Sequence, residues 1–212
     1  MGATVKDILR TAQAELGYRE SPPGSNRTKY GKWYGLDGQP WCMMFVQWVF
    51  HQAGAAELLC VRTASCGALM RGARAAEQWV TEQYRPGDLV IFDFSGKKTR
   101  TDHVGIVLEV RGDSLYTIEG NTAEGNDSNG GQVLTRLRPL RVVRGAVRPQ
   151  YTEEETAMDN TPSGYAVEAV RWAMENGILY GNVSGDLKLH DPVTREQALT
   201  FLHRFAKSIG KA

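Results

Sequence analysis

A cysteine, a histidine and a pair of polar strand residues are the side chains of this sequence that could together cleave an amide bond. Cys42 stands at the front of the apolar run PWCMMFVQWVF, residues 40–50. If a helix begins near residue 41, its unpaired N–H groups and its dipole lower the pKa of this thiol and favour a nucleophilic thiolate. Packing is the alternative interpretation, because free cysteine is among the most buried residue types.

A thiolate nucleophile needs a base that also protonates the leaving amine, and His103 is the best placed of the four histidines. It opens a predicted strand, and strand ends at the rim of a core are where site residues commonly lie. His51 is more than two turns along the same helix as Cys42, over ~13 Å away. His190 and His203 belong to the C-terminal part of the chain.

The imidazole in turn needs a partner on its other nitrogen, and Glu119 and Asn121 alternate on one face of the next predicted strand. If the two strands form a hairpin, His103 shares that face only when the loop has an odd number of residues or a bulge intervenes. We predict a three-residue loop, 111–113, which places Asn121 opposite His103. A regular two-residue turn would turn them to opposite faces. Either Glu119 or Asn121 could orient the imidazole.

The elements that must position these residues follow an α+β order. Helices are predicted over residues 4–17, 41–53 and roughly 65–80, and the aromatic-rich segment before the second helix is predicted to be an ordered loop. Strands are predicted at 89–94, 103–110 and 115–121, with one or two more within 133–149. Helices followed by a meander of antiparallel strands are typical of α+β folds rather than alternating βαβ folds.

Composition excludes several function classes. The net charge is +1, so the basic surface that binds nucleic acid or an anionic membrane is absent. No apolar run approaches the length of a membrane span, and the first twenty residues contain no apolar stretch of signal-peptide length. The three cysteines are too few for a disulfide scaffold, and no histidine falls at metal-ligand spacing with a cysteine. No metal or other cofactor is predicted.

The chain is predicted to divide into a domain at 1–148, a linker at 149–163 and a helix-loop-helix module at 164–212. The linker, PQYTEEETAMDNTPS, lacks hydrophobic periodicity and carries three adjacent glutamates. In the module, Thr194 and Gln197 have capping-box spacing. The stripe expected to be buried on the helix that follows is Leu199, Leu202, Phe205 and Ala206. A module of this size has little core of its own, so docking or self-association is expected.

The order of a helix-borne Cys42, a strand-borne His103 and a Glu119-x-Asn121 pair resembles the CHAP domain. This is the cysteine- and histidine-dependent amidohydrolase/peptidase group of the papain-like, NlpC/P60-related superfamily. The residues that carry the resemblance are GYRESPPGSNRTKYGKWYG, PWCMMFVQW, RPGDLVIFD, DHVGIVLEV and YTIEGNT, and they span most of residues 4–148.

The resemblance implies a papain-like α+β fold with Cys42 as nucleophile, His103 as base and then acid, and Glu119 and Asn121 as polar partners. It implies cleavage of an amide bond in the peptide part of peptidoglycan, by an amidase or an endopeptidase acting on the bacterial cell wall. The missing export signal fits a phage or prophage endolysin, and equally a chain whose signal has been removed. Some phage members carry an acidic calcium loop before the cysteine; here Asp37 is the single acid, so no calcium is predicted.

The C-terminal part resembles one S-layer homology module. The matching segments are YAVEAVRWAMENGILYG, GNVSGDLKLHDPVTREQ and ALTFLHRF, with VTREQ standing where that family has a TRAE-like motif. The resemblance implies binding of secondary cell-wall polymers, with Trp172 and Arg195 as the candidate contacts. Their alternative roles are core packing and helix capping.

The leading hypothesis is acyl transfer through a thiolate, with the oxyanion held by backbone N–H groups at the helix start. Tyr30, Trp33 and Trp41 are expected to line a shallow, open substrate groove, although aromatic residues beside a helix also pack in cores. Cys60 and Cys66 are interpreted as packing residues. Two other hypotheses keep the same residues: a catalytically silent wall-binding module, and a transacylase that passes the acyl group to an amine.

Overall fold

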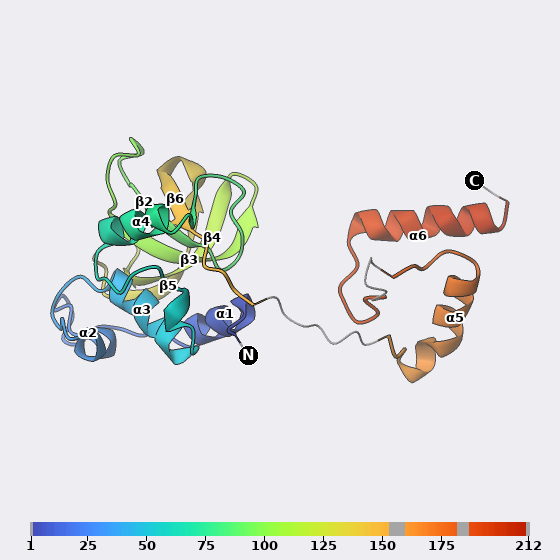
Figure 1. The fold of residues 1–212 in the computed structure, drawn as a ribbon, viewed down its shortest axis with the longest axis horizontal. Coiled ribbons are helices and arrows are strands. Elements are labelled where there is room, and N and C mark those ends of the chain that lie inside the picture. Colours follow the sequence, from blue (N-terminus) through green and yellow to red (C-terminus); the bar gives the residue numbers. More distant parts are fainter. Residues whose placement is uncertain (1, 153–159, 182–186, 211–212) are drawn as a thin grey trace. The chain divides into compact units, whose positions relative to one another are not determined.

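The structure is a computed structural model in which the chain forms two compact units, Met1–Glu153 and Glu154–Ala212 (Figure 1). The residues that it describes are 2–152, 160–181 and 187–210. Tyr151 lies in the expected linker but packs on the first unit, where its Oη donates to the Gly87 carbonyl at 2.7 Å. Residues 153–159 of the expected linker lie outside the described residues.

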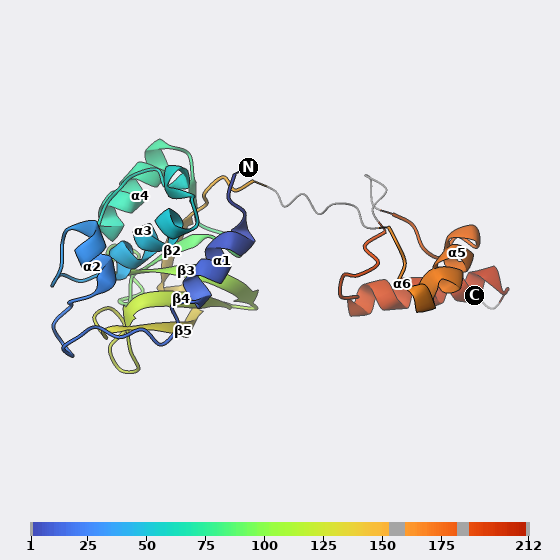
Figure 2. The ribbon, with the colours of Figure 1, turned by 90° about the horizontal axis from the view of Figure 1, so that it is seen from below.

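The first unit contains a six-stranded antiparallel sheet in the order β1-β6-β2-β3-β4-β5. Its strands are β1 (Trp79–Val80), β2 (Leu89–Phe92), β3 (His103–Arg111), β4 (Ser114–Thr122), β5 (Gln132–Pro139) and β6 (Val143–Val147). Its helices are α1 (Val5–Gln13), α2 (Lys29–Tyr34), α3 (Cys42–Gln52) and α4 (Cys66–Ala75), with the 3-10 turns η1 (Ala56–Leu58) and η2 (Leu140–Val142). Figure 2 shows the helices together on one side of the strands. The predicted α+β class, with N-terminal helices packed on an antiparallel sheet, is confirmed.

Helix α3 is the centre of the main core. Met43, Phe45, Val46 and Phe50 are completely buried, as expected for a helix that is apolar on nearly all sides. Full burial of each such side chain contributes about 1.5–3 kcal/mol relative to exposure, so this helix is held firmly in place. The first residue of α3 therefore has a well-determined position relative to the sheet.

The side chains of β2 alternate between two hydrophobic clusters, one on each face of the sheet. Leu89 and Ile91 belong to the cluster that contains α3, whereas Val90 and Phe92 belong to a smaller cluster on the other face. Close contact between α3 and β4 depends on Gly120, because a Cβ there would lie 2.6 Å from Phe45 Cβ. The packing of α3 on Gly120 thus fixes the backbone of β4 between Glu119 and Asn121.

The hairpin between β3 and β4 corrects one prediction. Its turn contains two residues, Gly112 and Asp113, because Arg111 pairs with Ser114. The predicted three-residue loop is therefore wrong. The register shifts between Val107 and Glu109, and this bulge restores the parity that the longer loop would have supplied.

The second unit contains η3 (Gly164–Ala166), α5 (Val167–Glu175) and α6 (Arg195–Ser208). The predicted capping box is confirmed: the Gln197 amide donates to Thr194 Oγ1 at 3.1 Å, and the Thr194 amide donates to Gln197 Oε1 at 2.8 Å. The stripe expected to be buried is largely exposed, with Leu199 65% and Leu202 63% accessible. Among the described residues of this unit, Ile178 is the one buried apolar side chain, which agrees with the small core expected from its length.

Among the described residues, no helix is both long enough and apolar enough to cross a membrane.

Candidate active site

Cys42 is the first residue of α3, where the thiol meets the free amides of a helix N-terminus. The first bond within the helix runs from the Phe45 amide to the Trp41 carbonyl at 2.9 Å, so the amides of residues 42–44 have no partner inside the helix. The Met43 amide lies against the Cys42 sulfur and helps to lower the pKa of its thiol. These amides are donors that could hold an oxyanion beside the sulfur.

The Cys66 thiol, His103 and the Met43 amide together lower the pKa of Cys42 well below the usual thiol value. The largest effect comes from the thiol of Cys66; burial opposes it, and His103 lowers the pKa further. A lowered pKa favours the thiolate, which is the nucleophilic form of cysteine. Cys66 itself begins α4 and lies beside Cys42, so the interpretation of Cys66 as a packing residue is incomplete.

His103 lies between Cys42 and Glu119 and is completely buried. Its Nε2 is 3.2 Å from Glu119 Oε2, and because that nitrogen faces the carboxylate, Nδ1 is the one available to the sulfur. Burial alone would lower the pKa of His103, but contacts with Cys42 and Glu119 raise it to about 9. Neither ring nitrogen has a well-aligned hydrogen bond, and catalytic hydrogen bonds commonly tighten only when substrate binds.

A polar loop before β3 fixes where His103 enters the sheet. Asp93 accepts hydrogen bonds from the amides of Thr99 and Arg100 at 2.7 and 2.9 Å, which closes the loop. Asp102 then accepts from the Phe94 amide at 3.0 Å. The strand consequently starts at a defined place, and the imidazole is its first side chain.

Glu119 is the partner of His103, and Asn121 has another role. The amide nitrogen of Asn121 donates to Asn129 Oδ1 at 3.1 Å, and its oxygen accepts from the Gly131 amide at 3.1 Å. Asn121 has a φ of 61°, a left-handed conformation that asparagine tolerates better than most residues. Asn121 therefore shapes the connection between β4 and β5, while Glu119 is the residue of the pair that contacts the imidazole.

Arg138 is a site residue that sequence reasoning missed. Its Nε donates to Glu119 Oε1 at 2.9 Å and its Nη2 to Glu119 Oε2 at 2.5 Å, so the carboxylate is held by a bidentate pair. Nη1 of Arg138 also donates to Asp127 Oδ1 at 2.7 Å, and the guanidinium lies 5.0 Å from the centre of the Phe94 ring. The hydroxyl of Thr117 donates to Glu119 Oε1 at 2.6 Å as well.

These contacts keep the carboxylate of Glu119 charged. Burial would raise its pKa, but Arg138 and then His103 lower it to about 2. A carboxylate with a lowered pKa next to His103 favours the protonated form of the imidazole. The result is a line of four interacting side chains: Cys42, His103, Glu119 and Arg138.

Gly105 provides the space for Glu119, and its replacement by alanine tests the arrangement. Continuing the β3–β4 register places Gly105 opposite Glu119, and a Cβ on Gly105 would lie 2.8 Å from Glu119 Cγ. We expect Gly105→Ala to displace the carboxylate from His103; a shift of about 1 Å in a catalytic group costs roughly 10²-fold in rate. Steady-state kinetics should show the loss in kcat rather than in KM.

Gly164→Ala is the matched control, because a Cβ there meets nothing within 4 Å and its φ is not left-handed. It should leave the rate unchanged. Equal rates for Gly105→Ala and the unmodified chain would show that the Glu119 contact is not needed.

The three aromatic residues expected in a substrate groove lie in different surroundings. Tyr30 and Trp41 are completely buried and stack with ring centres 5.2 Å apart, so the groove role does not fit them. The Trp41 indole donates to Glu20 Oε2 at 3.3 Å, which satisfies its N–H inside the core. Trp33 is half-buried and its ring lies 4.9 Å from that of His51.

No cluster of three or more histidine, cysteine, aspartate or glutamate side chains is arranged to hold a metal ion within the described ranges. Asp37, the acid before the cysteine, accepts the Thr28 amide at 2.9 Å. This bond helps to fix the start of α2.

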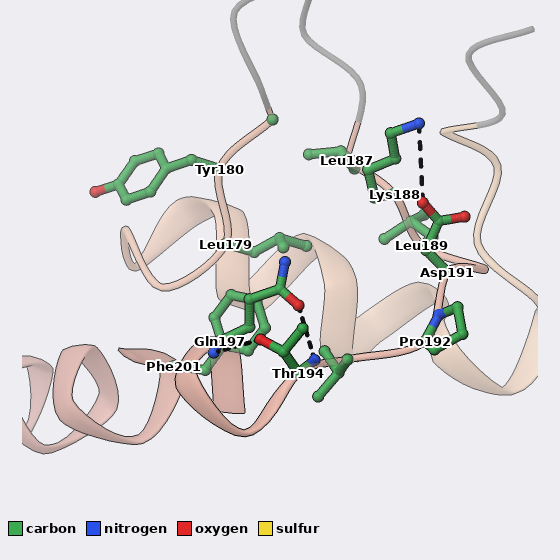
Figure 3. A pocket seen from close by; sticks show the side chains of 12 residues that line it. Leu179, Tyr180, Leu187, Lys188, Leu189, Asp191, Pro192, Thr194, Gln197 and Phe201 are labelled. Carbon is green, nitrogen blue, oxygen red and sulfur yellow. Dashed lines mark hydrogen bonds and ion pairs between the residues drawn. The ribbon is translucent and has the colours of Figure 1, made fainter. Parts of the chain in front are cut away.

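The second unit contains an open cavity of about 550 Å³ beside the start of α6 (Figure 3). Leu179, Tyr180 and Phe201 supply apolar walls, and Asp191 and Gln197 add polar groups. Its lining, as far as the chain is described, does not include the two residues expected to contact wall polymers.

Those two residues lie on different helices of the second unit. Trp172 on α5 is 44% accessible, and its ring centre is 6.0 Å from that of Phe205. Arg195 is the first residue of α6 and is exposed. Their role in binding wall polymers stays a prediction.

Residues 33–121 match the family model of the CHAP domain. The match runs from Trp33 to Asn121, so Cys42, His103 and Glu119 all lie within the CHAP region. No curated protein matches the chain.

Several solved structures are similar to this chain at low sequence identity. The crystal structure of Ly7917 has a TM-score of 0.40 and 18% identity, over 69% of this chain and 62% of that one. Ly7917 with the hydrolyzing product of MDP has a TM-score of 0.41 and 17% identity, over 69% and 63%. The wild type endolysin LysIME-EF1 has a TM-score of 0.45 and 14% identity, over 93% and 95%. The chain thus spans less than two thirds of the length of Ly7917.

Proposed function

We propose that the first unit is a cysteine hydrolase that cleaves an amide bond in the peptide part of peptidoglycan. The observation that carries this proposal is the buried array of Cys42, His103, Glu119 and Arg138. In it, a thiol with a lowered pKa, an imidazole with a raised pKa and a charged carboxylate are in contact. The CHAP match over residues 33–121 supports the substrate class.

In the proposed mechanism, the Cys42 thiolate attacks the carbonyl carbon of the amide. The amides at the start of α3 hold the resulting oxyanion. His103, protonated in the resting pair, gives its proton to the departing amine and then takes one from the water that releases the acyl group. Glu119 remains ionised throughout and keeps the ring aligned with the sulfur.

The same array could also serve a transacylase, which passes the acyl group to an amine instead of to water. The reaction products distinguish a hydrolase from a transacylase. Purified peptidoglycan is digested with the full chain, and the fragments are analysed by mass spectrometry. Hydrolysis yields free peptide termini, whereas acyl transfer yields amine-coupled products. A new amino terminus on the residue next to intact glycan identifies an amidase, and new termini within the peptide identify an endopeptidase. Absence of any cleavage would refute the proposal and favour a silent wall-binding protein.

The pH dependence of the reaction follows from the two shifted groups. The active form has a thiolate at Cys42 and a proton on His103. As pH rises, kcat/KM should increase through the lowered pKa of Cys42, below the usual thiol range, and should fall again near pH 9 as His103 loses its proton. Rates on a soluble muropeptide measure both limbs.

Alkylation by iodoacetamide is the control for this assignment, because it requires only the thiolate. Its rate should follow the acid limb and should not fall near pH 9. A fall of both rates together near pH 9 would contradict the assignment of the alkaline limb to His103 as the acid.

A further inference from the structure

A cavity of the first unit adjoins the candidate catalytic histidine. Its volume is about 480 Å³, which is within the range of small-molecule pockets, and it is open to solvent. Its lining is Phe94, Ser95, Arg100, Asp102 and Ser128. The proposed mechanism gives none of these side chains a chemical task.

Two of the lining residues connect the cavity to the catalytic array. Asp102 directly precedes His103 in the chain. The ring centre of Phe94 lies 6.0 Å from that of His103 and 5.0 Å from the guanidinium of Arg138. A peptide held with its scissile amide at Cys42 and His103 can therefore extend into this cavity.

Arg100 is the lining residue with donors available to a ligand. Its Nε lies 2.9 Å from Asp102 Oδ1, while Asp102 Oδ2 accepts the Phe94 amide at 3.0 Å, so the guanidinium is attached to a fixed carboxylate. Among the described residues, neither terminal nitrogen of Arg100 has a hydrogen-bond partner. The side chain is 68% exposed, which leaves both nitrogens accessible. This edge of a guanidinium matches the two oxygens of a carboxylate.

The charges along the cavity favour an anionic ligand. The segment 95–102 contains three basic residues, Lys97, Lys98 and Arg100, against the single acid Asp102, although the chain as a whole has a net charge of only +1. Arg144 adds to this group, because its Nη1 donates to the Arg100 carbonyl at 2.7 Å. Basic residues gathered in this way attract a negative group to the cavity.

The neighbouring acids are occupied by other partners. Asp93 accepts two backbone amides of its own loop. Asp127, the neighbour of Ser128, accepts Nη2 of Arg136 and Nη1 of Arg138, each at 2.7 Å. These carboxylates therefore offer little to a cationic ligand.

We propose that this cavity is a specificity subsite in which Arg100 binds a free carboxylate of the peptide part of peptidoglycan. The inference rests on the proposed function, because the ligand is part of the substrate cleaved at Cys42. Asp102 holds the Nε side of the guanidinium, and the two terminal nitrogens donate to the carboxylate oxygens. The hydroxyl of Ser128 is a further donor on the cavity wall.

The test uses pairs of soluble muropeptides that differ at one group, a free carboxylate in one and a carboxamide in the other, with one pair for each carboxylate of the peptide. Binding to the full chain carrying Cys42→Ala is measured by isothermal titration calorimetry, and kcat/KM is measured with the unmodified chain. For one pair we expect the carboxylate form to bind roughly tenfold more tightly, as for a charged hydrogen bond open to water. The difference in kcat/KM should lie mainly in KM.

Two further variants assign the preference to Arg100. Arg100→Gln should remove it and leave the affinity for the carboxamide form unchanged. Arg10→Gln is the matched control, because Arg10 is 74% exposed and paired with Asp7, and it does not line the cavity. It should keep the full preference.

Equal dissociation constants within every pair, or a preference that survives Arg100→Gln, would overturn the subsite. An effect of Arg100→Gln confined to intact walls that carry phosphate polymers would also overturn it, because the bound anion would then be a phosphate. The binding measurement needs no cleavage. An Arg100-dependent preference in a chain that cleaves neither muropeptides nor walls would therefore refute the proposed function and leave the carboxylate site standing.

Discussion

Cys42→Ala is expected to abolish cleavage of purified peptidoglycan while leaving the fold intact. In the proposed mechanism the other groups of the array act through the sulfur, so its loss removes the attacking atom itself. In a catalytic array of this type, loss of the nucleophile costs on the order of 10⁶-fold in kcat. Clearing of a peptidoglycan suspension and release of new amino termini measure the effect, and near-ultraviolet circular dichroism checks the packing around α3.

Cys60→Ala is the matched control, since it removes a half-buried thiol away from His103. It should cleave at the rate of the unmodified chain. Comparable cleavage by Cys42→Ala would place the nucleophile elsewhere. Binding of walls by both variants without cleavage by either would favour the silent wall-binding alternative.

The parts of the site that the sequence could predict are those with a local chemical signature. The apolar run behind Cys42 indicates a buried helix, and the polar residues before His103 indicate a strand entry. Both elements form where expected. The strand parity needed to bring Glu119 to His103 was also correct, but a bulge supplies it instead of a longer loop. No residue in this segment signals a bulge, whereas hydrophobic periodicity does signal a helix or a strand.

Arg138 could not be predicted, because its partner lies on another strand and the local pattern suggests the opposite orientation. In β5, Arg138 is buried while the neighbouring Leu137 is 58% exposed. Hydrophobicity alone assigns the leucine to the core and the arginine to solvent. Only the presence of buried Glu119 makes the inward guanidinium favourable, and that pairing joins residues 19 positions apart.

The contact between Cys42 and Cys66 was missed for a related reason. A cysteine at a helix start is recognisable in sequence, but the neighbour of its thiol depends on how α3 and α4 are placed. Both helices are amply specified as elements, and their relative position is not. Long-range pairs of this kind are therefore the part of the site that required the structure.

Glu119→Gln is expected to reduce kcat by roughly 10²–10⁴-fold, because the imidazole loses the charge that orients it and stabilises its protonated form. The pKa of His103 should fall below its value of about 9, so the alkaline limb of kcat/KM moves to lower pH. The same change leaves Arg138 buried beside a neutral amide. Breaking a buried ion pair costs about 3–5 kcal/mol in the free energy of unfolding.

Arg138→Met separates the effect on stability from the effect on catalysis. It leaves the Glu119 carboxylate without its guanidinium, so this variant should also be destabilised, and the pKa of Glu119 should rise from about 2. Because His103 can still pair with the carboxylate, part of the activity should remain.

The double variant Glu119→Gln with Arg138→Met completes the cycle. With both charges removed, no uncompensated charge is buried, so it should be more stable than either single variant in urea unfolding. It should nevertheless be as inactive as Glu119→Gln, since stability returns without the carboxylate. Recovery of kcat in the double variant would show that the loss in Glu119→Gln came from unfolding. An unchanged kcat and alkaline limb in Glu119→Gln alone would show that His103 is oriented by another group.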